Sequence, residues 1–97
     1  MAIVRINEFR AAIGKAAGLR DFLASVISTI QQAPGCQHCE LLVDHEDPER
    51  FAIIETWDSI AAHQAAAMRI PPEKMAEVRA LLGDSPRGRY YDPLDGR

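Results

Sequence analysis

The chain has 97 residues, 47% of them hydrophobic and 26% charged, which fits one domain, residues 1–97, of ordinary globular composition. A net charge of −3 and a pI near 5.5 provide no basic surface, which argues against nucleic acid as a partner. No apolar run approaches the ~18 residues of a membrane span, and the start MAIVRINEF lacks the layout of a signal peptide, so we expect a cytoplasmic protein with no membrane partner.

The first half of the chain predicts a strand followed by a long helix. Residues 2–9 alternate in polarity and begin with β-branched side chains, which is typical of a strand. A helix follows, because six apolar residues recur at helical spacing over three turns: Leu19, Phe22, Leu23, Val26, Ile27 and Ile30. Pro34 and Gly35 end this helix.

The middle of the chain predicts a hairpin. Residues 36–44 and 50–57 have the pattern of strands, and the polar turn between them contains Pro48, which favours a tight reversal. Both faces of this hairpin carry apolar residues, so we expect each face of the sheet to be covered.

The last third predicts a divided helix and a final strand. Asp58 or Ser59 can cap a helix, and its inward stripe is expected at Ile60, His63, Ala67 and Ile70. Pro71 and Pro72 end it and begin a second helix, with a buried stripe at Met75, Val78, Leu81 and Leu82. A strand over 87–91 follows, and we expect the tail 93–97 to fray.

The predicted order is therefore β-α-β-β-α-β with an antiparallel sheet, which is the ferredoxin-like arrangement of the α+β class.

Cys36-Gln-His-Cys39 has the spacing of a C-x-x-C motif. A redox dithiol of this kind needs its first thiol at a helix N-terminus, whereas here the motif opens a strand, and its odd spacing sends the two thiols to opposite faces. A zinc site needs two further ligands, and no second cluster is present. We therefore expect structural, free thiols and no metal site.

Three polar residues fall on otherwise apolar faces. His63 lies on the apolar stripe of its helix, where it can act as a base or acid near neutral pH or sit in the core with one hydrogen bond. Glu55 shares a strand face with Phe51 and Trp57, so its carboxylate needs a partner or has a raised pKa, and Arg5 is the natural partner. Asn7, in a strand interior, also needs a partner.

Short catalytic motifs of other chemistries do not occur in the sequence, which has no glycine-rich phosphate loop, no G-x-S-x-G and no H-E-x-x-H. Hydrolytic, nucleotide-dependent and zinc chemistries are therefore disfavoured.

Tyr90 and Tyr91 are adjacent in the last predicted strand, so one ring faces each side of the sheet. One of them can help to line a pocket.

An ordered set of short motifs resembles the antibiotic biosynthesis monooxygenase (ABM) domain. These motifs are Pro34-Gly35-Cys36, Glu40-Leu-Leu, Asp47-Pro48-x-Arg50-Phe51 and Ile54-Glu55-x-Trp57, followed by a helix with a histidine. The resemblance implies a protomer whose sheet pairs with a second copy in a dimeric α+β barrel, with the pocket between sheet and helices. The family's usual histidine comes one turn later than His63, near Ala66.

The resemblance also implies chemistry. The family includes cofactor-free oxygenases of phenolic or quinol substrates, so we expect a small aromatic substrate and O₂, with no cofactor. On this basis His63 would be the base, Asn7 and Arg5 would hold the oxyanion, and Trp57, Glu55 and Phe51 would complete the substrate site.

Two other hypotheses remain. The first is a non-catalytic dimeric binding or stress-response module, which is favoured by the small side chains of the histidine-bearing helix: Ala61, Ala62, Ala65, Ala66 and Ala67. The second is oxidative haem degradation, because the haem-degrading branch of the family has Asn and Trp at the positions of Asn7 and Trp57.

Overall fold

The computed structural model describes residues 2–94. Within this range the elements are β1 (Ile3–Arg10), α1 (Ala16–Gln31), β2 (Cys36–Val43), β3 (Arg50–Trp57), α2 (Ile60–Ala67), α3 (Pro72–Leu81) and β4 (Arg87–Tyr91). The strands form one antiparallel sheet in the order β2-β3-β1-β4. This confirms the predicted α+β, ferredoxin-like order with its divided second helix. The end of the tail expected to fray, 95–97, lies outside the described residues.

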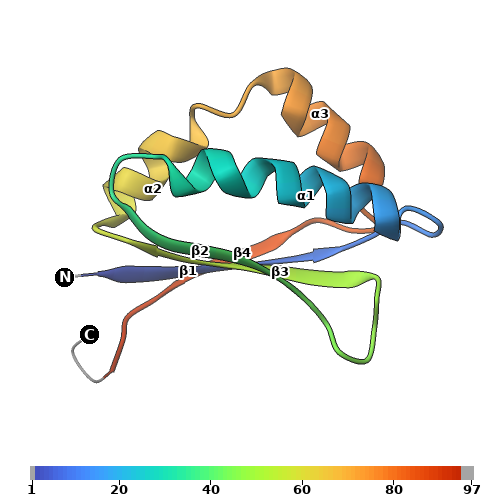
Figure 1. Ribbon diagram of the computed structural model, residues 1–97, viewed down its shortest axis with the longest axis horizontal. Helices are drawn as coiled ribbons and strands as arrows, with labels where there is room; N and C mark the ends of the chain where they lie inside the picture. Colours follow the sequence, from blue (N-terminus) through green and yellow to red (C-terminus); the bar gives the residue numbers. More distant parts are fainter. Residues whose placement is uncertain (1, 95–97) are drawn as a thin grey trace.

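The molecule has two layers (Figure 1). The helices lie together on one side of the sheet, while the β2–β3 turn and the chain after β4 bend towards the other side. The first side is therefore the helix-covered face, and the second is the open face. Among residues 2–94, no helix is long and apolar enough to cross a membrane.

The core lies between α1 and the sheet. Leu19 and Leu23 of α1 are 0% and 2% exposed, and they pack against Phe51 and Ile53 of β3. The other apolar residues of the predicted α1 stripe are partly buried around them, so the period of about 3.6 residues identified the inward side of this helix correctly.

The inward side of α2 differs from the prediction. The cap is Ser59, whose hydroxyl accepts a hydrogen bond from the Ala62 amide at 3.1 Å. Behind this cap the helix turns Ala62, His63 and Ala66 towards the protein, whereas Ile60 is 41% exposed. The reason is a close approach, because a Cβ on Gly35 would lie only 2.7 Å from the Ala62 Cβ. Only a small side chain fits that contact.

The predicted stripe of α3 is correct except at its start. Val78, Leu81 and Leu82 are partly buried and pack against the core. Met75 is 41% exposed, so the prediction of a buried methionine was wrong.

A β-bulge in β2 overturns the expectation for the two thiols. Cys36 pairs with Trp57 and the next pair is His38 with Thr56, so one extra residue, Gln37, interrupts the ladder. Cys39 in turn pairs with Glu55. Because Glu55 and Trp57 both face the helices, the bulge brings Cys36 and Cys39 onto the same, helix-covered face.

Candidate functional site

A cluster of polar and aromatic side chains lies beneath α2 on the helix-covered face, and we call it the His63 cluster. Arg5 of β1 pairs in register with Glu55 of β3 on one side and with Tyr90 of β4 on the other. These pairings bring three side chains into one row across the sheet. Trp57 lies two residues beyond Glu55, and His63 comes down onto the row from α2. The cluster therefore comprises Arg5, Glu55, Trp57, His63 and Tyr90.

Glu55 is the buried carboxylate of the cluster, with 5% of its surface exposed. The Trp57 indole N–H donates a hydrogen bond to Glu55 Oε1 at 2.7 Å. Burial raises the pKa of Glu55, while the Trp57 hydrogen bond and the Arg5 charge act in the opposite direction. The expected partner Arg5 therefore acts on Glu55 through its charge, and the hydrogen bond comes from Trp57.

His63 connects the carboxylate to a phenol. Its Nδ1 lies 2.6 Å from the Tyr90 hydroxyl, and its Nε2 lies 3.9 Å from Glu55 Oε1. The imidazole packs edge-to-face on both Trp57 and Tyr90, with ring centroids 5.5 and 5.4 Å away. The tautomer that suits both polar neighbours carries its proton on Nε2, facing Glu55, and accepts from Tyr90 at Nδ1.

The same surroundings keep the imidazole neutral. Burial lowers the pKa of His63, and the charge of Arg5 lowers it further. At neutral pH the ring is therefore a free base, able to take up a proton. The inward orientation predicted for His63 is confirmed, and its contacts are those of an acid–base group.

Gly88 makes room for Arg5. A Cβ at Gly88 would lie 2.1 Å from Nη2 and 2.6 Å from Cζ of Arg5, so any larger residue would displace the guanidinium. With glycine there, Arg5 Cζ lies 4.7 Å from the centroid of the Tyr90 ring, in a cation–π contact. Neither Gly88 nor the specific contacts of Tyr90 can be predicted from the sequence pattern, because both depend on which strand lies beside β1.

Asn7 and Phe51 lie further along the sheet. Asn7 is the next residue after Arg5 on the same face of β1 and pairs with Ile53 and Gly88. Its Oδ1 is buried with no hydrogen-bond partner among residues 2–94, and the same holds for Nε of Arg5. Phe51 precedes Glu55 by four residues, ~13 Å along a strand, and packs in the apolar core. Phe51 therefore does not join the cluster.

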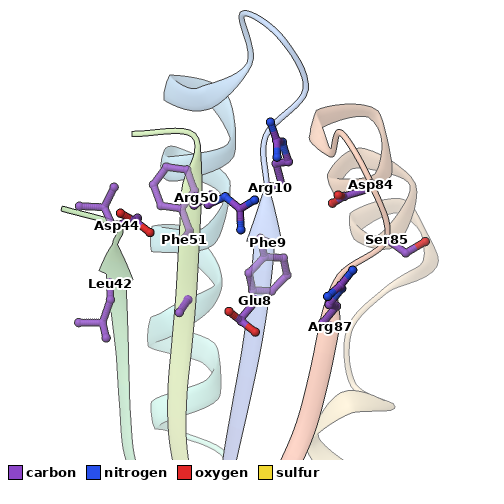
Figure 2. Close-up of a pocket in the computed structure, with 12 residues that line it drawn as sticks. Glu8, Phe9, Arg10, Leu42, Asp44, Arg50, Phe51, Asp84, Ser85 and Arg87 are labelled. Carbon is purple, nitrogen blue, oxygen red and sulfur yellow. The ribbon is translucent and has the colours of Figure 1, made fainter. Parts of the chain in front are cut away.

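A hollow lies elsewhere in residues 2–94, at the end of the sheet near the β2–β3 turn (Figure 2). It has a volume of about 360 Å³. Three arginines and three acids line it, so their formal charges cancel: Arg10, Arg50, Arg87, Glu8, Asp44 and Asp84. A second hollow of about 280 Å³ lies at the β2 edge, beside the two cysteines. Neither of these two hollows is lined by a residue of the His63 cluster.

No three side chains of the metal-ligating types, His, Cys, Asp and Glu, are gathered for a metal ion anywhere in residues 2–94.

The sequence profile of the antibiotic biosynthesis monooxygenase family matches residues 2–67, more than half of the chain. The chain belongs to this family. The match runs from β1 to the end of α2 and so includes Arg5, Glu55, Trp57 and His63, whereas Tyr90 and Gly88 lie outside it. No curated protein sequence matches the chain significantly.

Solved structures of similar fold agree with this assignment. Rv0793 from Mycobacterium tuberculosis is 20% identical, with a TM-score of 0.85 over 98% of this chain and 97% of its own. SO0527 from Shewanella oneidensis is 26% identical, with a TM-score of 0.80 over 93% and 88%. A variant of SnoaB, a cofactor-independent oxygenase from Streptomyces nogalater, is 18% identical, with a TM-score of 0.78 over 96% and 93%. At such identities the likeness to Rv0793 and SnoaB establishes the shared fold.

Proposed function

We propose that the protein is a cofactor-independent monooxygenase that acts on a small phenol or quinol with O₂. The observation that carries the proposal is the series Glu55–His63–Tyr90, a neutral base held between a buried carboxylate and a phenolic hydroxyl. Membership of the monooxygenase family supports it, as does the likeness in fold to SnoaB.

The proposed chemistry needs a base and a dry site. Loss of the substrate's phenolic proton leaves an electron-rich anion, which passes one electron to O₂. The resulting radical and superoxide combine at a ring carbon that carries hydrogen, and the peroxide then loses water to give a quinone. The balance is one phenol and one O₂ to one quinone and one water, so all the electrons come from the substrate. Apolar walls favour this course because they exclude water from the reactive anion.

Each residue of the cluster has a proposed part in that sequence. Both nitrogens of His63 face protein groups, so a substrate proton would reach Nδ1 through the Tyr90 hydroxyl, which gives its own proton to His63 as it accepts another. Glu55 would then stabilise the imidazolium from the Nε2 side. The buried Nε–H of Arg5, which has no hydrogen-bond partner among residues 2–94, and the side-chain amide N–H groups of Asn7 would donate to the substrate oxyanion.

The cluster lines neither of the two hollows described above, and on this proposal substrate enters as side chains over the cluster move. Arg5 is the residue best suited to move, since its guanidinium is held by the ring of Tyr90 and by no ion pair among residues 2–94. Displacing it would open the row at Gly88, on the edge strand β4.

The test is oxygen consumption with a panel of phenols and quinols. We expect His63→Gln and Tyr90→Phe each to lower kcat by about 100-fold or more, the usual contribution of an acid–base group. His45→Gln, in an exposed turn, is the matched histidine control and should retain the wild-type rate. Equal rates in wild type and His63→Gln would remove His63 from the mechanism, and absence of turnover across the panel would contradict the proposed reaction class.

A second candidate is a non-catalytic small-molecule-binding or stress-response module, which is favoured because the cluster lines neither of the two hollows described above. On this alternative the aromatic compounds bind without consuming O₂, and His63→Gln changes stability alone. Calorimetric titration run beside the oxygen electrode separates the two candidates, because only the enzyme couples binding to turnover.

Haem degradation is a poor fit. A haem-ligating histidine needs a free nitrogen facing an open cavity, but both nitrogens of His63 face protein groups and neither hollow is lined by this residue. We expect the Soret band of added haem to be unchanged by the protein, whereas a shift that His63→Gln abolishes would restore this reading.

We further propose that the protein is a homodimer that forms through the open face and works in the cytoplasm. Val4, Ile6 and Ile54 are partly exposed on this face, and Leu42 is 39% exposed. The β2–β3 turn and the chain after β4 bend towards the same side, so a second sheet could lie between them (Figure 1). Free cysteines support a reducing compartment. Sedimentation equilibrium should give twice the chain mass, and Ile54→Lys should give a monomer.

A further inference from the structure

The two cysteines have an arrangement that the proposed oxygenase does not use. Cys36 is half-buried and Cys39 is buried, and both are free thiols. The bulge at Gln37 turns both towards the helix-covered face, where Cys36 packs against the core cluster that contains Cys39. The 280 Å³ hollow at the edge of β2 is lined by both cysteines and by Gln31, Gln37 and His38.

We propose that Cys36 and Cys39 form a two-coordinate site for a soft, thiophilic cation of the Cu(I) type. Thiolate sulfur is the ligand that such ions select, and two ligands in line satisfy a closed-shell monovalent ion. The site differs from zinc, because among residues 2–94 no third or fourth ligand joins the two cysteines.

The register favours a bridging ion over a disulfide. The partners of Cys36 and Cys39 are two residues apart on β3, which corresponds to about 6.8 Å of strand. That is the upper limit of the Cα separation in disulfides, whose sulfurs must come within about 2.05 Å of each other. A metal–sulfur bond of ~2.3 Å, the length known for zinc, would instead let the sulfurs stay about 4.6 Å apart. Side chains of that spacing on one face can meet an ion without distorting the strand.

His38 is a lining residue and not a proposed ligand. Its partner Thr56 places it on the open face, and its Nε2 lies 3.1 Å from Glu40. His38→Ala is therefore a matched control within the same hollow. It removes an imidazole that lies on the open face and leaves both thiols in place.

The experiment is an anaerobic competition for Cu(I) held by excess bicinchoninate, with full-length protein. We expect one Cu(I) per chain, release of two protons per ion at neutral pH, and a near-ultraviolet thiolate-to-metal absorption. Cys36→Ser and Cys39→Ala should each weaken binding by about 100-fold or more, the order of the gain from two linked ligands. His38→Ala should bind as wild type does, and Zn(II) should not compete.

Three results would overturn the proposal. They are failure of the wild type to take Cu(I) from the competitor, equal binding by either cysteine variant, and one Cu(I) shared by two chains. Cys36 is half-buried, so its serine variant tests the site even if Cys39→Ala fails to fold. A mass loss of 2 Da under mild oxidation, without Cu(I) uptake, would show that the pair closes to a disulfide instead.

Discussion

Replacing Gly88 with alanine tests the placement of Arg5 with a single methyl group. The added Cβ would stand 2.1 Å from Nη2, 2.6 Å from Cζ and 3.2 Å from Nε of Arg5. All three distances are shorter than van der Waals contact, so one group must move. The atoms in the way are the far end of a flexible side chain, so we expect the guanidinium to leave the Tyr90 ring while the backbone stays in place.

The cost in stability should be small. Loss of the cation–π contact costs about 0.5–2 kcal/mol, while alanine in place of glycine in a strand returns about 0.5–1 kcal/mol. The two terms largely cancel and leave a net cost of at most about 1.5 kcal/mol, where 1 kcal/mol corresponds to a shift in Tm of roughly 4–8 °C for a chain of this size. Gly88→Ala should therefore fold.

The electrostatic effect should be clear. The charge of Arg5 lowers the pKa of His63, so moving the charge away should raise that pKa towards its ordinary value. NMR titration of the histidine ring protons measures this, with His38 and His45 as internal references. Arg5→Met removes the same charge without changing any residue of β4, and it should shift the pKa of His63 in the same direction. If Gly88→Ala leaves the titration of His63 unchanged while Arg5→Met shifts it, then glycine does not hold the guanidinium in place.

Three further predictions concern the cluster and the thiols. Trp57→Phe removes the donor to Glu55 and should cost about 1–3 kcal/mol beyond lost packing, measured by urea unfolding; an unchanged midpoint would mean that the carboxylate finds another donor. The pKa of Cys39 in the folded state, about 12, lies above its ordinary value of 9.0, so between these pH values the native state binds more protons than the unfolded state. The free energy of unfolding should therefore fall as pH rises from about 9. Cys39→Ala should flatten that decline. The raised pKa of Glu55 likewise means that the free energy of unfolding should fall as pH rises above about 4.5. Glu55→Gln, whose amide oxygen can still accept the hydrogen bond from Trp57, should abolish this dependence of stability on pH in thermal melts across acidic pH. An unaltered dependence would assign it to another group.

Local spacing was enough to predict most of the fold. The apolar stripe of α1 predicted its inward side, and the alternation of β3 predicted that Phe51, Glu55 and Trp57 share one face, because burial follows the periods of helix and strand directly. The inward orientation of His63 and the burial of Glu55 followed from the same periods. None of these predictions needed a tertiary contact beyond a covered sheet.

The errors arose where one element meets another. The bulge at Gln37 cannot be read from a run of strand-forming residues, yet one extra residue reverses the face of Cys36. The close approach of Gly35 to Ala62 turned α2 away from its most apolar side. The role of Gly88 in making room for Arg5 depends on β4 lying beside β1. In that pairing Gly88 lies opposite Asn7, a residue more than eighty positions away in the chain.

The position of the histidine is understood best through β4. The resemblance described in the sequence analysis led us to expect a histidine near Ala66, one turn later and ~4.5 Å further along the helix, and Ala66 here packs in the small apolar cluster around Trp57. At position 63 the imidazole instead reaches the Tyr90 hydroxyl. Tyr90 in turn carries the guanidinium that Gly88 admits. A histidine moved back to position 66 would lose its phenol partner, so the displaced histidine, the tyrosine and the glycine form one arrangement, and we expect them to function or fail together.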